Sequence, residues 1–129
     1  MSQDFKTEAT PQKVQERLSE LVPGFGVAWK DSLFIAQDCS FTVHGVFAEF
    51  SSYLRDHFAE LCEERRKQLF HYVEECVTAG DRADMQSMSD LSNAVCTCFL
   101  ETIAGEGKIS EMVSAYLGSE SRRYFDQWN

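Results

Sequence analysis

Proline and glycine are scarce in this sequence, with two and seven copies in 129 residues. A turn-rich β-sandwich needs more of both, because each of its short strands ends in a turn. No apolar run approaches the roughly 20 residues that a membrane-spanning helix requires. The opening residues, MSQDFKTEATPQK, contain no apolar segment of a secretory signal. We therefore expect a helical protein that is neither secreted nor embedded in a membrane.

Motifs of catalysis and cofactor binding are missing as well. The sequence has no glycine-rich phosphate loop, no Gly-x-Ser-x-Gly turn and no Cys-x-x-Cys pair. His57–Glu60 and His71–Glu74 have the spacing of the Glu-x-x-His pairs in di-iron bundles but the reverse order, and we interpret them as solvated helix faces. We predict that the protein is not an enzyme and has no catalytic, cofactor-binding or metal-binding residues.

The five cysteines are expected to be free thiols. Their number is odd, and a chain of this length buries a sufficient core without cross-links, which favours a reducing cytoplasm. Cys96 and Cys98 stand two apart, so their side chains point about 200° apart around a helix. They cannot share a metal ion or form a relaxed disulfide, and small apolar thiols are commonly buried. We place both in the core.

Helical spacing of apolar residues predicts a single all-α domain, a bundle of about six helices in residues 10–129 behind a flexible segment 1–9. Thr10 and Pro11 form a helix start, with a capping hydroxyl and a proline in the first turn. Pro23-Gly24 ends this first helix. Residues 25–40 lack a clean period, so we expect a loop with one helical turn.

The second half of the fold is predicted from a long apolar stripe. It runs from Phe41 to Val77, and no Gly or Pro marks a break between residues 46 and 79. We expect a turn near residues 56–62 that gives two antiparallel helices, the second of which ends at Ala79-Gly80-Asp81. The next helix extends from Asp84 to Ala104, with alternative caps at Ser87, Ser89 or Asp90.

That helix is apolar on almost every side between Leu91 and Leu100, so residues 86–104 should form the buried centre of the bundle. We expect Asn93 to be buried there and hydrogen-bonded to a neighbouring element. Gly105-Glu106-Gly107 ends the helix. A short helix around Ile109–Leu117, closed by Gly118, then precedes a final helix capped by Ser119 or Ser121.

Charge is the strongest pointer to a partner. Twenty-one acids against twelve bases give a formal net charge of −9, which repels nucleic acid and attracts a basic protein. Acids and tyrosines of the middle helices form the predicted binding surface. Its residues are Glu49, Tyr53, Asp56, Glu60, Glu63, Glu64, Tyr72 and Glu75.

Three stretches carry a resemblance to known proteins: HGVFAEF at 44–50, FHYVEE at 70–75 and LSNAVCTCFLE at 91–101. With them, residues 14–104 resemble a largely uncharacterised family of small helical bacterial proteins, some of which look like immunity proteins of polymorphic toxin systems. The resemblance implies a cytoplasmic protein that binds and blocks a toxin, and it carries no catalytic motif.

Two other functions remain open on the sequence. One is a small enzyme or ligand-binding domain with a pocket near His44, Glu49, Asn93 and Glu101. The other is a homodimeric interaction module that pairs through Tyr124, Phe125 and Trp128. These three lie on one face of the last helix, where docking on the protein's own domain is the commoner outcome.

Overall fold

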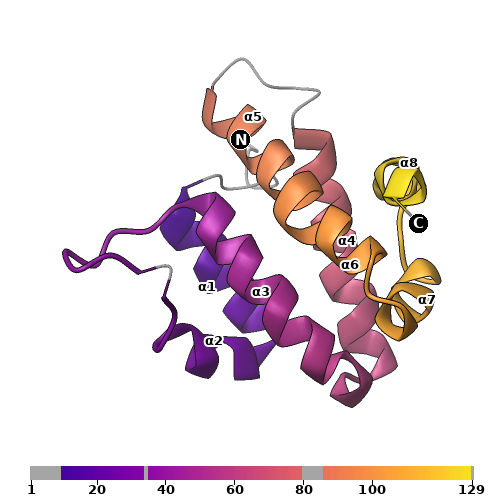
Figure 1. Ribbon diagram of the computed structural model, residues 1–129, viewed down its shortest axis with the longest axis horizontal. Coiled ribbons are helices and arrows are strands. Elements are labelled where there is room, and N and C mark those ends of the chain that lie inside the picture. Colours follow the sequence, from indigo (N-terminus) through magenta and orange to yellow (C-terminus); the bar gives the residue numbers. More distant parts are fainter. Residues whose placement is uncertain (1–9, 34, 80–85, 129) are drawn as a thin grey trace, which may run out of the picture.

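The computed structural model describes residues 10–33, 35–79 and 86–128, and within them the chain forms helices and loops without strands (Figure 1). Segment 1–9, predicted to be flexible, lies outside the described residues, as do Gly80, Asp81 and Asp84. Described helices reach lengths of 4–17 residues, and none is both long and apolar enough to cross a bilayer. In chain order the elements are α1 (Pro11–Leu21), α2 (Pro23–Trp29), α3 (Val43–His57), η2 (Phe58–Glu60), α4 (Glu63–Ala79), α5 (Gln86–Ala94), η4 (Val95–Leu100), α6 (Glu101–Ala104), α7 (Lys108–Ser114) and α8 (Ser119–Trp128).

Helix α1 begins as predicted. Pro11 is its first residue, and the Thr10 hydroxyl accepts a hydrogen bond from the Lys13 backbone N–H at 3.3 Å. Pro23 follows the end of α1, but it also starts α2, where we predicted a loop with one turn. Because α2 packs against α1, a Cβ on Gly26 would lie only 3.1 Å from Ser19. Gly26, which follows the predicted stop at Pro23-Gly24, therefore permits close packing of α2 on α1.

The predicted turn between the two middle helices is confirmed. Helix α3 ends at His57, η2 makes the turn, and α4 begins at Glu63. Arg66 of α4 donates hydrogen bonds to the carbonyls of Phe58 and Ala59 at 3.2 and 3.3 Å, and its guanidinium lies over the Phe58 ring. The turn thus needs neither glycine nor proline, because an arginine satisfies its carbonyls and a buried ring fixes its position.

A continuous run through α5, η4 and α6 forms the predicted central helix (Figure 1). It contacts α3 and α4, and η4 and α6 also contact α8. Ser87, Ser89 and Asp90 all lie inside this run, so the predicted caps are wrong. Ala104 is its last residue, as predicted from the glycines that follow.

The central helix is not enclosed on every side. Asn93, Thr97 and Glu101, at successive four-residue steps, form an exposed stripe, so the expected burial of the Asn93 amide is wrong. Both Cys96 and Cys98 were predicted to lie in the core. Cys96 is buried there, whereas Cys98 is only half-buried and packs against the core. Each of these polar residues has apolar neighbours in the sequence, so the exposed face of the central helix was not recognised from the sequence.

A π-helical turn in η4 explains how the long apolar face stays directed inward. The Glu101 N–H bonds to the Cys96 carbonyl, five residues back, in place of the usual four. Buried residues recur at steps of four, at Leu91, Val95 and Phe99. In an α-helix each such step drifts about 40° around the axis. The wider π turn covers the second of these steps, from Val95 to Phe99, and reduces the drift there.

The C-terminal helices close one side of the bundle. Helix α7 ends at Ser114, slightly before the predicted Gly118, and α8 packs on α4 and α6. Phe125 is completely buried in the protein's own core, which is the expected docking and makes its predicted role in a homodimer contact wrong. Tyr124 is 42% exposed, and the side chain of Trp128 lies outside the described part of the structure.

Burial predicts distinct thiol reactivities. Cys39 and Cys62 are exposed, while burial raises the pKa of the Cys96 thiol to about 11 and also raises that of Cys76. Because the thiolate is the reactive form, an aromatic disulfide reagent at pH 8 should label Cys39 and Cys62 rapidly in the native protein, and Cys76 and Cys96 only after denaturation. Mass spectrometry of the labelled peptides tests this. Rapid native labelling of Cys76 would contradict the core described above.

Candidate functional site

Four predicted surface acids gather at one end of the bundle. Asp56 lies in the last turn of α3, Glu60 lies in η2, and Glu63 and Glu64 are the first residues of α4. All four side chains are exposed. We call these four residues the acidic corner. Glu63 and Glu64 lie in the first turn of α4, where the helix dipole favours negative charge.

The other predicted surface residues are more dispersed. Tyr53 borders the acidic corner: it is half-buried and stacks on His57, with ring centroids 4.0 Å apart. Burial raises the pKa of Tyr53, and the nearby Glu60 carboxylate raises it further. Glu49 accepts a hydrogen bond from Ser32 at 2.8 Å. Glu75 lies 3.3 Å from His71 on α4.

Tyr72 does not belong to the surface. Its side chain is buried, and burial raises the pKa of its hydroxyl far above the ordinary value. Its assignment to a partner-binding surface is therefore wrong. The helical period of α4 places Tyr72 beside Leu69, Val73 and Cys76 on the face that packs inward, which a charge-based reading of the sequence overlooks.

Arginines of the described chain are largely occupied by internal contacts, which leaves the acids in excess at the surface. Arg66 holds the α3–α4 turn, and Arg65 donates to the last carbonyls of α1. Arg122 hydrogen-bonds Ser114 before α8. At the acidic corner itself, Arg55 lies 3.7 Å from Asp56 and 3.6 Å from Glu106, which are exposed or half-exposed pairs of little strength.

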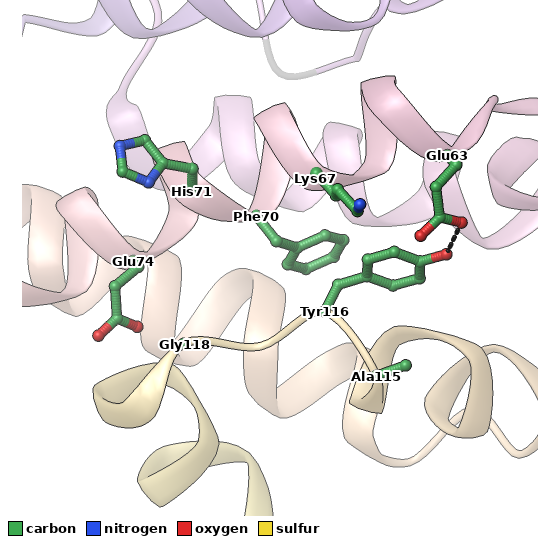
Figure 2. A pocket seen from close by; sticks show the side chains of 8 residues that line it. All are labelled: Glu63, Lys67, Phe70, His71, Glu74, Ala115, Tyr116 and Gly118. Atoms are coloured by element: carbon green, nitrogen blue, oxygen red, sulfur yellow. Dashed lines mark hydrogen bonds between the residues drawn. The ribbon is translucent and has the colours of Figure 1, made fainter.

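A groove adjoins the acidic corner, and Glu63 belongs to both (Figure 2). It lies between α4 and the segment that connects α7 with α8, and its volume is about 410 Å³. We call it the aromatic groove. Its lining consists of Glu63, Lys67, Phe70, His71, Glu74, Ala115, Tyr116 and Gly118.

Two rings and a carboxylate set the chemistry of the aromatic groove. The Tyr116 hydroxyl donates to Glu63 at 2.6 Å, and the rings of Phe70 and Tyr116 stack with centroids 6.3 Å apart (Figure 2). Arg66 donates to the same Tyr116 oxygen at 3.4 Å. Aromatic faces beside a fixed carboxylate suit the apolar stem and positive head of an arginine or lysine side chain.

At the other end of the groove, Glu74 caps a helix that is remote in sequence. Its carboxylate accepts hydrogen bonds from the backbone N–H groups of Glu120 and Ser121 at 3.0 and 2.9 Å, and from the Ser121 hydroxyl at 2.7 Å. Glu74 therefore holds α8 on α4 and satisfies two orphan donors of its first turn. The predicted caps, Ser119 and Ser121, are replaced by this carboxylate.

The four residues of the alternative pocket do not converge. Asn93 Nδ2 lies 3.4 Å from His44 Nε2, so the structure brings these two together. Glu49 is directed to Ser32 in the loop after α2, and Glu101 is exposed two turns beyond Asn93. Among the described residues, no group of three or more His, Cys, Asp and Glu side chains is placed to hold a metal ion.

Comparison with known families covers nearly the whole structure. A family model described as "Domain of unknown function (DUF7674)" matches residues 15–129. The chain belongs to this family. The match includes the acidic corner, the aromatic groove and the complete central helix. No curated protein and no solved structure matches the chain. The predicted membership of an uncharacterised family is thus confirmed, while the resemblance to immunity proteins remains a prediction.

Gly118 provides a test of the α8 cap. A Cβ at this position would lie 2.5 Å from the Glu74 carboxylate, so Gly118→Ala should displace Glu74 and lower the free energy of unfolding by about 0.5–2 kcal/mol, the usual value of a lost cap. Urea unfolding followed by circular dichroism measures the change. Gly105→Ala is the matched control, because its nearest neighbour would lie 4.0 Å away. Equal effects of the two substitutions would contradict the assignment.

The cap also predicts a pH dependence of stability. Burial raises the pKa of Glu74, but the hydrogen bonds from Ser121 and Glu120 outweigh it, so the folded-state pKa lies below its ordinary value. The stabilisation is therefore complete above the ordinary glutamate pKa and is lost as the pH falls through the lowered one. The difference in unfolding free energy between wild type and Glu74→Gln should shrink over this acidic range. A pH-independent difference would show that the charge of Glu74 is unimportant.

Proposed function

We propose that the protein is a non-enzymatic binding domain that binds a basic partner protein through the acidic corner and the adjoining aromatic groove. In its most specific form, the proposal is that the partner is a toxin domain, which this protein neutralises in the cytoplasm as an immunity protein. The toxin partner follows from the resemblance of the three stretches at 44–50, 70–75 and 91–101, and the binding mode follows from the surface.

The observation that carries the proposal is the excess of exposed carboxylates at the acidic corner. Four acids lie within nine residues of the chain, from Asp56 to Glu64, and the neighbouring Arg65 and Arg66 are turned to backbone carbonyls. Such a concentrated negative field steers a basic protein toward this end of the bundle and speeds its association. Nucleic acid would be repelled by the same field.

The aromatic groove can supply the binding energy that electrostatic steering alone does not provide. Binding energy at protein interfaces concentrates in a few buried anchors, commonly arginine and aromatic side chains. An arginine or lysine of the partner can place its stem on the half-buried Tyr116 ring, which the buried Phe70 ring supports, and its charge near Glu63, which already holds the Tyr116 hydroxyl. Glu63 thereby connects long-range attraction at the acidic corner with close contact in the groove.

Charge neutralisation tests the proposal. The triple variant Asp56→Asn, Glu60→Gln, Glu64→Gln removes three exposed charges while keeping Glu63 and its hydrogen bond. The partner to use is the protein encoded by the adjacent gene, co-expressed and purified as a complex. At about 0.2–1 kcal/mol for each surface charge, we expect the Kd to rise roughly 3- to 100-fold, mainly through slower association, and the salt dependence to weaken.

The matched control carries the same change in net charge elsewhere on the molecule. Glu16→Gln, Asp31→Asn and Asp126→Asn are exposed positions on α1, after α2 and on α8. Equal weakening by both triple variants would mean that only total charge matters and would remove the acidic corner from the proposal. Absence of any complex with the adjacent gene's product, together with unchanged growth on deletion of this chain, would contradict the immunity role.

A further inference from the structure

A second hollow adjoins the aromatic groove, with which it shares Lys67 and His71, and its charge is opposite to that of the acidic corner. It lies between the C-terminal half of α1 and the first half of α4, and its volume is about 580 Å³. We call it the basic hollow. Its polar lining consists of Arg17, Glu20, Arg65, Lys67, Gln68 and His71. Three permanent positive charges thus surround one carboxylate, in a chain whose net charge is −9.

Arg65 is fixed in place by the end of α1. Its Nη1 donates to the carbonyls of Glu20 and Leu21 at 2.9 and 3.2 Å. These are C-terminal carbonyls of a helix, where a cation offsets the negative end of the dipole. A guanidinium has five N–H donors on three nitrogens. Because only Nη1 of Arg65 bonds to the backbone, its other N–H groups remain available to a ligand.

Arg17 and Lys67 add charge from the two opposing helices. Arg17 forms an ion pair with Glu20 at 3.1 Å, and its guanidinium lies 5.8 Å from the centroid of the Tyr72 ring. Lys67 and His71 are one turn apart on α4 and therefore share a face. The guanidinium of Arg65, which the end of α1 holds in place, together with the exposed guanidinium of Arg17 and an ammonium, suits the recognition of phosphate and carboxylate groups.

From this arrangement we infer that the basic hollow binds a small multivalent anion carrying phosphate or carboxylate groups. Its volume lies in the range of roughly 300–1,000 Å³ that small-molecule pockets occupy. Long polyanions are disfavoured, because the acidic remainder of the surface repels whatever extends beyond the hollow. None of the four residues of the acidic corner lines the basic hollow, although the hollow shares Lys67 and His71 with the aromatic groove.

Pyrophosphate and citrate are suitable probes of the two anion chemistries. Each is titrated into the ¹⁵N-labelled full chain at constant ionic strength, with sodium chloride as the compensating salt, and amide shifts are followed by NMR. We expect saturable shifts that centre on the residues around Arg17, Arg65 and Lys67 for at least one probe. The Arg17→Gln, Lys67→Gln double variant should weaken that binding at least tenfold.

The control is Arg123→Gln with Lys108→Gln, which removes the same charge from exposed positions on α8 and α7. Arg123 pairs with Glu120 at i,i+3 spacing, as Arg17 pairs with Glu20, so the two arginines start from similar environments. Saturation by only one probe assigns the hollow to that chemistry. Shifts that fail to saturate with both probes, or equal weakening by the control variant, would overturn the inference.

Discussion

The stack of aromatic rings around Phe99 is the contact on which the rest of the structure depends. Phe99 lies in the π-helical part of the central helix, with Phe50 of α3 at 5.6 Å and Phe70 of α4 at 6.1 Å between ring centroids. Phe50 continues the stack to Phe25 of α2 at 4.9 Å. Large rings contribute most of the buried apolar area in a small domain, so this stack fixes three helices on one central helix.

The surface features follow from that arrangement. Because α3 and α4 both pack on the central helix, the turn that joins them projects at one end of the bundle and carries the acidic corner outward. Phe58 and Arg66 hold this turn, and Tyr116 meets Phe58 at a ring separation of 6.1 Å. The same packing brings the α7–α8 connection beside α4, which creates the aromatic groove, and brings α1 beside α4, which creates the basic hollow.

Helix type and helix limits were largely predictable from the sequence. The Thr10–Pro11 start, the turn near 56–62 and the end at Ala104 depend on local chemistry: caps, glycine breaks and apolar spacing. Predictions based on local sequence rules failed where contacts between residues distant in the sequence determine the structure. Pro23 and Gly24 resemble a stop, yet packing against α1 stabilises a new helix there. Asn93 resembles a buried amide among apolar neighbours, yet its side chain is exposed beside His44 of α3.

The candidate site was less predictable, for the same reason. Acidic residues could be recognised one by one, but their spacing did not distinguish exposed Glu64 from Glu74, whose carboxylate caps α8 from 46 residues away. Tyr72 was expected at the surface because it lies among charges, and it is buried because α4 turns that face inward. The clustering of Arg17 with Arg65 and Lys67 spans two helices and has no signature in the order of residues.

The sequence by itself determined an all-α domain, the limits of most helices and the strongly negative charge, because these arise from local propensity and from composition. Only the tertiary structure decided which acids stand together, which tyrosine is buried, and that the scattered cations meet in one hollow. Side chains 40 or more residues apart become neighbours only through the packing of the rings on the central helix, and that packing depends on shape and volume rather than on periodicity.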